Sequence, residues 1–203
     1  MSLDASSRRL MKELQQLSTE PPTGIVVNKD AASADLKQWR VDVIGATGTL
    51  YEGEKFSLQF RFTQQYPFNS PEVMFVGENI PVHPHVYSNG HICLSILSED
   101  WTPALSVQAV CLSILSMLSS AREKKRPPDN ALYVRTCNKN PSKTRWWFHD
   151  DTPTLRCDGR TAADPLSTYH VIEDVLCAIY TYSCCCMLLV CGSSVLNSPF
   201  AAL

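Results

Sequence analysis

Residues 56–62 read Phe56-Ser57-Leu58-Gln59-Phe60-Arg61-Phe62, so apolar and polar side chains alternate strictly. Successive side chains of a β-strand point to opposite faces, and the alternation therefore predicts a strand with one buried face. Shorter strand patterns lie on both sides, at residues 39–43 before Gly45 and at residues 72–76 before Gly77. Strand patterns that follow one another this closely predict an antiparallel meander.

Helical patterns flank these strands. Leu10, Leu14 and Leu17 recur on one face of a helix, which the prolines at positions 21 and 22 end. Apolar residues between positions 107 and 118 predict a second helix with Ser106 as its N-cap, and residues 130–138 predict a third. A helix, a meander and then further helices is the order of an α+β fold.

Composition narrows the class of protein. The chain has 203 residues, 44% of them apolar, and a net charge of -2, which excludes wholesale disorder and gives no strong attraction to nucleic acid or membrane. No apolar stretch follows Met1, so no secretory signal is expected. The nine cysteines are odd in number and irregularly spaced, which favours free thiols in a reducing compartment.

The residues that can carry chemistry concentrate in residues 81–94, Pro81-Val82-His83-Pro84-His85-Val86-Tyr87-Ser88-Asn89-Gly90-His91-Ile92-Cys93-Leu94. Cys93 is either a nucleophile for a carbonyl or thioester carbon, or a small buried residue. Alternatively, His83, His85, His91 and Cys93 offer four zinc ligands. A thiol hydrolase with a histidine base is the third interpretation. Spacing alone leaves all of these open.

Four motifs in register resemble the ubiquitin-conjugating enzyme family, whose pattern is YPFxxP, HPN, a cysteine eight residues after that Asn, and WSPA. They are Tyr66-Pro67-Phe68-x-x-Pro71, His83-Pro84-His85, His91-Ile92-Cys93-Leu94-Ser95-Ile96-Leu97 and Trp101-Thr102-Pro103-Ala104. The resemblance covers residues 5–151. It is most similar to the W type, which modifies protein N-termini, because of His85 and the stretch from Pro127-Pro128-Asp129-Asn130 to Trp146-Trp147-Phe148-His149-Asp150-Asp151.

The resemblance implies the UBC fold in residues 1–151, with an N-terminal helix, a four-stranded antiparallel meander, an active-site loop and C-terminal helices. It implies that Cys93 accepts ubiquitin from the activating enzyme as a thioester and passes it to a protein amine. No metal and no organic cofactor are expected, since ATP is used by the activating enzyme. The expected partners are ubiquitin, the activating enzyme, a RING or U-box ligase and substrates with flexible N-termini. Nucleic acid is not expected as a partner. The expected localisation of the protein is the nucleus and the cytoplasm.

His85 stands where the family has the Asn of HPN, which supports the loop beside the cysteine and is proposed to stabilise the oxyanion. This departure favours α-amines over lysines as acceptors, because roughly a quarter to a third of α-amines but only roughly 0.1% of lysines are neutral near pH 7.4. The alternative for His85 is a loop-packing role. Asp129 and Asn130 match the region where the family places an acid near the cysteine; for Asp129, a helix N-cap or a solvated loop charge is the alternative.

Other positions resemble the family's contact surfaces. On the first helix, Arg8, Arg9 and Lys12 resemble the activating-enzyme contact, and the alternative is a solvated helix face. Ligase binding is expected at Phe75, as an exposed aromatic, with Pro103 and Ala104. The basic run at residues 122–126 is either a nuclear import signal or a set of cations at a helix C-terminus.

Residues 152–203 form a divergent, cysteine-rich and partly apolar tail. Its uncharged stretch at residues 175–190 is shorter than the ~20 residues of a bilayer crossing. A membrane contact is therefore expected only if this tail anchors; a packed helix and an alternative-exon sequence are the other interpretations. Two rival functions stay open, a lysine-directed conjugating enzyme and an inactive ubiquitin-binding scaffold, although the presence of Cys93 counts against the scaffold.

Overall fold

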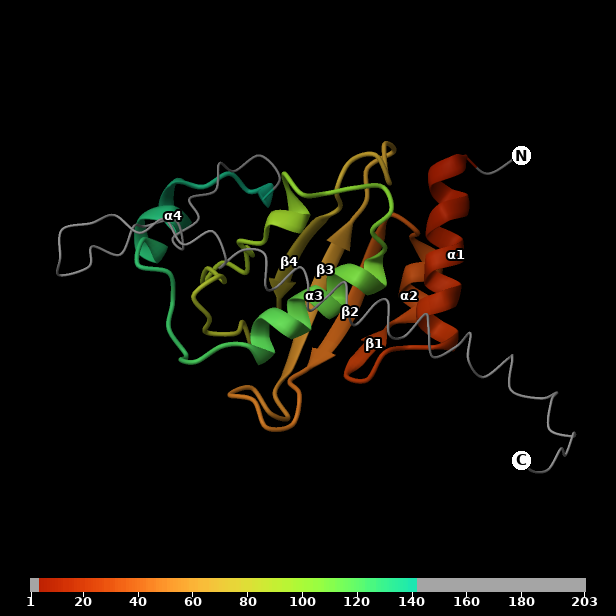
Figure 1. The fold of residues 1–203 in the computed structure, drawn as a ribbon. Coiled ribbons are helices and arrows are strands. Elements are labelled where there is room, and N and C mark those ends of the chain that lie inside the picture. The colour runs from red at the N-terminus through yellow and green to blue at the C-terminus, as the bar shows by residue number, and fades with distance from the viewer. Residues whose placement is uncertain (1–3, 142–203) are drawn as a thin grey trace, which may run out of the picture. The chain divides into compact units, whose positions relative to one another are not determined.

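The computed structural model describes residues 4–141, and Figure 1 shows their arrangement. One antiparallel sheet has the strand order β1-β2-β3-β4, formed by β1 (Ile25–Val27), β2 (Gln38–Ile44), β3 (Lys55–Arg61) and β4 (Glu72–Val76). Helix α1 (Ala5–Thr19) precedes the sheet and α2 (Lys29–Ala34) joins β1 to β2. The short helix η1 (Ser95–Leu97), α3 (Val107–Ser119) and α4 (Asn130–Thr136) follow. The predicted α+β fold with a four-stranded meander is confirmed.

The local signals that predicted these elements have the expected structural basis. In β3 the side chains of Phe56, Leu58 and Phe60 are buried while those between them are not. Helix α3 begins where Ser106 accepts a hydrogen bond from the backbone N–H of Ala109 at 3.2 Å, so the predicted N-cap is confirmed. Helix α1 ends at Thr19, just before the two prolines.

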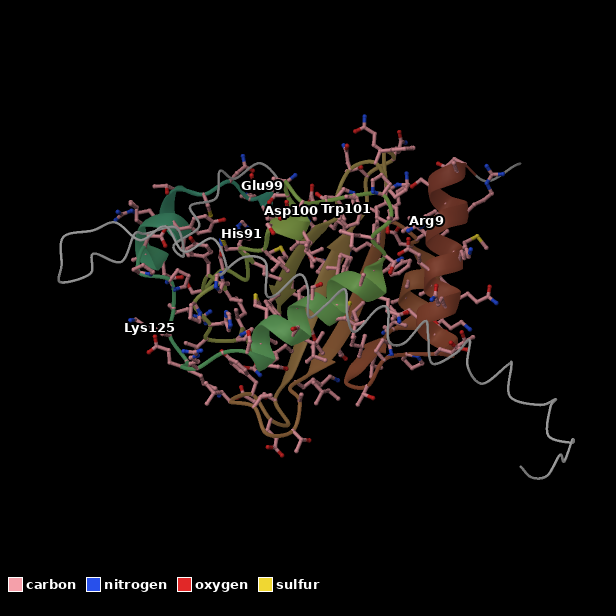
Figure 2. All side chains as sticks on the ribbon, viewed as in Figure 1. Arg9, His91, Glu99, Asp100, Trp101 and Lys125 are labelled. Atoms are coloured by element: carbon pink, nitrogen blue, oxygen red, sulfur yellow. The ribbon has the colours of Figure 1, made fainter. Side chains whose placement is uncertain are left out.

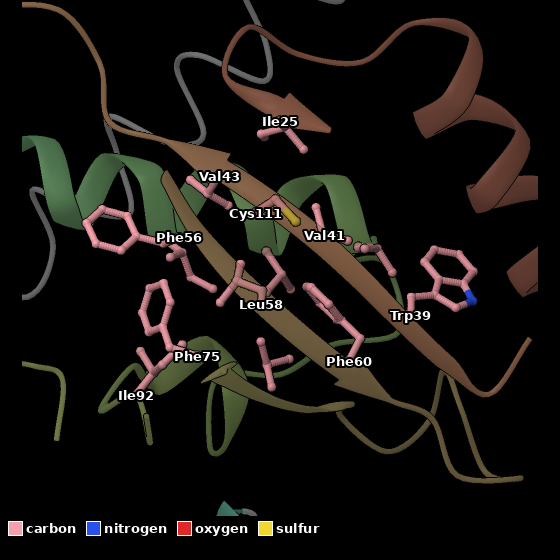
Figure 3. Close-up of a cluster of buried hydrophobic side chains, with 14 of the residues drawn as sticks. Ile25, Trp39, Val41, Val43, Phe56, Leu58, Phe60, Phe75, Ile92 and Cys111 are labelled. Atoms are coloured by element: carbon pink, nitrogen blue, oxygen red, sulfur yellow. The ribbon is translucent and has the colours of Figure 1, made fainter. Parts of the chain in front are cut away.

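The core lies between the inner face of the sheet and α3. Helix α3 crosses the sheet in Figure 1, and Figure 3 shows Cys111 of this helix among Val41, Val43 and Leu58 of the strands. Phe75 belongs to the same cluster.

The prediction that Phe75 is an exposed aromatic is therefore wrong. Phe75 is 0% exposed, and it pairs with Leu58 on the inner face of the β3–β4 ladder. Its neighbours Met74 and Val76 point to the other face. The side chain of Phe75 has no surface to offer to a ligase.

The segment after β4 turns back and pairs with that strand. The backbone N–H of Phe75 donates to the carbonyl of Gly90 at 2.8 Å, and Met74 and His91 form an antiparallel bridge. Gly90 has φ +89°, and a β-carbon there would lie 2.0 Å from the carbonyl oxygen of Phe75. Only glycine allows this approach, which places residues 91–93 beside the edge of the sheet.

Within residues 4–141, no helix combines the length and the apolar character that crossing a bilayer requires. The three interpretations of the tail at residues 152–203 concern residues outside this described part.

Candidate active site

Cys93 lies at the edge of the sheet in a small apolar cluster of its own. Its side chain is 5% exposed and packs with Tyr87 and Tyr133, with Cys137 at the border of the cluster. Its backbone N–H donates to the carbonyl of His85 at 2.8 Å. This bond holds Cys93 next to the turn at residues 83–86, in which the N–H of Val86 donates to the carbonyl of His83. Cys111, in contrast, lies in the main core, where burial raises the pKa of its thiol and keeps it protonated.

His83 has a structural role. Its Nε2 lies 3.1 Å from the carbonyl of Met117 and its Nδ1 accepts the backbone N–H of His85 at 3.0 Å. Because a carbonyl only accepts, Nε2 carries the proton and the ring is a neutral tautomer. Burial, with His85 as a second cause, lowers the pKa of His83 to about 4. Nδ1 therefore closes the turn, while Nε2 ties the turn to α3.

His85 contributes its backbone on both sides of this turn. Its N–H donates to His83 and its carbonyl accepts from Cys93; both bonds are made by the main chain, and the predicted role of the His85 side chain stays a prediction. Its ring is half-buried, with its centroid 5.5 Å from that of His83.

The zinc-site interpretation is not supported. In the part of the chain that the structure describes, no three His, Cys, Asp or Glu side chains come together as metal ligands. His83 makes the two hydrogen bonds described above, and Nδ1 of His91 lies 2.9 Å from the hydroxyl of Tyr133. These contacts engage the nitrogens in protein hydrogen bonds instead.

A tyrosine brings Asp129 to the cysteine cluster. The hydroxyl of Tyr87 donates to Oδ2 of Asp129 at 3.3 Å, and its ring stacks on Tyr133 with a centroid distance of 3.6 Å. Burial, Asp129 and Cys93 all raise the pKa of Tyr87, so its hydroxyl stays protonated. Asp129 occupies the N-cap position of α4, as the capping alternative predicts, although its side chain makes no capping hydrogen bond.

Asn130 ties α4 to the same loop. Its Oδ1 accepts the backbone N–H of Ser88 at 2.8 Å, and its Nδ2 donates to the Ser88 hydroxyl at 3.2 Å. The structure therefore brings Cys93, His85, Asp129 and Asn130 to one region, as predicted, and gives Asn130 the task of holding the loop in place.

Arg126 holds the other end of the loop. Its guanidinium donates to the carbonyls of Pro81 at 2.7 Å, Val86 at 3.1 Å and Ile80 at 3.1 Å. The interpretation of residues 122–126 as cations at a helix C-terminus holds only in that they follow α3, since the helix ends at Ser119 and its last turn carries no basic residue. The nuclear import interpretation stays a prediction.

Phe68 is an aromatic residue with a 79% exposed side chain, in the loop before β4. Pro103 and Ala104 are exposed as well. Nε1 of Trp101, labelled in Figure 2, donates to the carbonyl of Pro67 at 2.8 Å and joins the two loops. This bond connects the loop that carries the exposed Phe68 to the loop that carries Pro103 and Ala104.

The basic face of α1 is divided. Arg8 and Lys12 are exposed. Arg9 forms an ion pair with the buried Glu13 and donates to the carbonyl of Leu105 at 3.1 Å. Arg9 therefore also serves to pack α1 against the start of α3.

Several residues of the site escaped the sequence analysis, namely Tyr87, Tyr133, Arg126 and Phe68. Tyr87 and Phe68 stand inside the quoted motifs, so their large polar or apolar side chains were the available signal. Tyr133 and Arg126 reach the loop from 40 or more residues away, so neither Tyr133 nor the basic run that contains Arg126 indicated a contact with the loop.

Comparison with known proteins agrees with this geometry. The family model described as "Ubiquitin-conjugating enzyme" matches residues 9–149. Ubiquitin-conjugating enzyme E2 W of Caenorhabditis elegans is 74% identical over 149 residues, which are 73% of this chain and 98% of the relative. The probable E2 W-A of Danio rerio is 66% identical over 145 residues, 71% of this chain and 96% of the relative.

A solved structure shows the same fold. The ubiquitin conjugating enzyme E2 UbcA1 from Agrocybe aegerita is 48% identical, with a TM-score of 0.65, and the match covers 68% of this chain and 99% of that one. The motifs, the fold and these relatives agree, and the chain belongs to the E2 ubiquitin-conjugating enzymes.

Proposed function

We propose that this enzyme carries ubiquitin as a thioester on Cys93 and passes it to the α-amino group of flexible protein N-termini, together with a RING or U-box ligase. Family membership implies ubiquitin, an activating enzyme and a ligase as partners. The observation that carries the proposal is the position of Cys93, which packs with Tyr87 while Tyr87 holds the Asp129 carboxylate.

The proposed transfer needs one bond made and one broken. The amine nitrogen attacks the thioester carbonyl carbon, the C–S bond breaks, and the Cys93 sulfur leaves as a thiolate. The nitrogen loses a proton to solvent as the new bond forms. Tyr87 stays protonated and serves as a donor, so Asp129 is the group of this pair that can accept a hydrogen bond from the amine. Because a thioester is already activated, the reaction needs no metal or organic cofactor.

The preference for α-amines rests on His85. An asparagine side chain offers an amide N–H, whereas His85 offers a ring N–H at a different distance from the backbone. If the site gives less help in stabilising the oxyanion and in deprotonating the acceptor, an amine that is already neutral reacts faster than one that must first lose a proton. An α-amine has a pKa of about 7.7–8.0 against about 10.4 for lysine.

The contact surfaces follow from exposure and charge. We place the ligase at Phe68 with Pro103 and Ala104, because a large exposed aromatic beside a rigid proline is a good anchor. We place the activating enzyme at Arg8 and Lys12 on α1, whose charges are exposed to a partner.

The acceptor preference is tested with the loaded enzyme. Ubiquitin is first loaded on the full chain, the activating enzyme is then stopped, and two peptides compete in one tube. One peptide has a free α-amine and no lysine; the other has a blocked N-terminus and one lysine. We expect product on the α-amine peptide in large excess. Faster transfer to the lysine peptide would contradict the preference and favour a lysine-directed enzyme. No transfer from a loaded enzyme would favour the scaffold.

A further inference from the structure

His91 and Tyr133 form a buried contact between the sheet and α4 that the reaction itself does not use. The hydroxyl of Tyr133 lies 2.9 Å from Nδ1 of His91, and both side chains are buried. Figure 2 labels His91, which lies on the segment that follows β4. Burial lowers the pKa of His91, while a backbone hydrogen bond to Lys139 acts in the opposite direction. A neutral ring that donates to this carbonyl leaves Nδ1 to accept the Tyr133 O–H.

The two ends of this contact differ in rigidity. His91 is fixed by its bridge to Met74 of β4, and its backbone N–H donates to Oδ1 of Asn89 at 3.2 Å. Helix α4 has seven residues, and Tyr133 is its buried side chain. A helix this short does not hold its place by itself, so its position depends on its contacts, which are those of the buried Tyr133 together with the Asn130 bonds to Ser88.

The position of α4 determines where Asp129 lies. Asp129 immediately precedes α4, and Tyr133 is stacked on Tyr87, whose hydroxyl donates to Asp129. A shift of Tyr133 therefore displaces both members of the Tyr87–Asp129 pair relative to Cys93.

We propose that the His91–Tyr133 hydrogen bond is a positioning contact that locks α4 to the edge of the sheet and thereby aligns Asp129 for transfer of ubiquitin from Cys93. Neither the Tyr133 hydroxyl nor the His91 ring is proposed to take part in bond making or proton transfer, although the Tyr133 ring packs in the same cluster as Cys93. The inference rests on the proposed function, since it assumes that Cys93 carries the thioester. It concerns the transfer step and leaves the loading of Cys93 unaffected.

The test separates loading from transfer in the full chain. The variants are Tyr133→Phe, which removes only the hydroxyl, His91→Phe, which removes the acceptor, and the two changes combined. Loading is followed on non-reducing gels. Transfer is followed as single-turnover discharge to an α-amine peptide at several peptide concentrations, which separates the maximal rate from the half-saturating concentration. Ile25→Val is the matched control, because loss of one buried methylene in β1 weakens the fold about as much as loss of one hydrogen bond.

We expect loading within about twofold of the unmodified chain and a maximal discharge rate reduced about fivefold, which is the effect of one neutral hydrogen bond. The half-saturating concentration stays unchanged. The combined variant is no slower than either single variant, since both remove the same interaction. His91→Asn restores most of the rate, because its amide oxygen takes the place of Nδ1. Ile25→Val discharges normally.

Three results overturn the inference: an unchanged maximal rate in Tyr133→Phe, multiplying effects in the combined variant, or a parallel loss of loading and discharge. Failure of the unmodified chain to load ubiquitin on Cys93 is a different result, and it overturns the proposed function together with the inference.

Discussion

Replacement of Arg126 by alanine should loosen the turn that carries His83 and His85. The guanidinium makes three hydrogen bonds, to the carbonyls of Ile80, Pro81 and Val86. A hydrogen bond to a charged group contributes about 1.5–3 kcal/mol. The three share one side chain, and burial lowers the pKa of Arg126, so a desolvation cost offsets part of their sum.

We therefore expect the free energy of unfolding to fall by about 2–4 kcal/mol in Arg126→Ala. For a domain of this size the melting temperature falls by about 2–4 °C per kcal/mol, hence by roughly 5–15 °C in total. Arg126→Lys keeps the positive charge but loses the planar guanidinium group. Its free energy of unfolding should therefore lie between those of the unmodified chain and Arg126→Ala.

The assay is urea and thermal unfolding of the full chain, with Lys125→Ala as the control. Lys125, labelled in Figure 2, is exposed and forms one pair with Glu123 at 4.0 Å. Its replacement should change stability by less than about 0.5 kcal/mol. Equal stability of Arg126→Ala and Lys125→Ala would refute the idea that Arg126 holds the turn.

Phe68→Ala should leave the free energy of unfolding unchanged and abolish ligase-stimulated discharge, because Phe68 is exposed. Phe75→Ala should instead lower the free energy of unfolding by about 3–5 kcal/mol, because Phe75 is buried in the core. Equal ligase stimulation in Phe68→Ala and the unmodified chain would contradict the proposed contact of Phe68 with the ligase. Gly90→Ala should slow loading at least tenfold, since its β-carbon meets the Phe75 carbonyl at 2.0 Å, and normal loading would count against this close approach. The pKa of His83 is lowered to about 4, so the unfolded chain binds more protons than the folded chain between about pH 6.5 and 4. The free energy of unfolding should therefore fall as the pH is lowered through this range, by up to about 1.4 kcal/mol per pH unit. His83→Gln should flatten this slope and leave the effect of His91, whose pKa is also lowered, and an unchanged slope would be the contrary result.

The fold was predictable wherever a pattern was long and one-sided. The seven residues of β3 alternate without interruption, and α3 has both an apolar run and a capping serine. Strand β1 and helix α2 gave no such signal, because three and six residues are too few for a period to repeat.

The face of β4 could not be read from its sequence. Glu72 is followed by four apolar residues, Val73, Met74, Phe75 and Val76, so alternation does not say which of them point inward. Pairing with β3 decides it, since Phe75 lies opposite Leu58 on the inner face.

The candidate site divides in the same way. Cys93 and His85 lie eight residues apart in one loop, and the motif identified both as candidate site residues. The contact of Tyr87 with Asp129 and that of His91 with Tyr133 each span 42 residues. Spacing along the chain carries no information about such contacts, which depend on how α4 packs.

The most direct test of the central claim is the chemistry of the adduct at Cys93. The full chain is mixed with activating enzyme, ATP and ubiquitin and run on a gel without reducing agent. We expect a thiol-labile adduct in the unmodified chain and in Cys111→Ala, a thiol-resistant adduct in Cys93→Ser, and no adduct in Cys93→Ala. An adduct that persists in Cys93→Ala, or none in the unmodified chain, would contradict it.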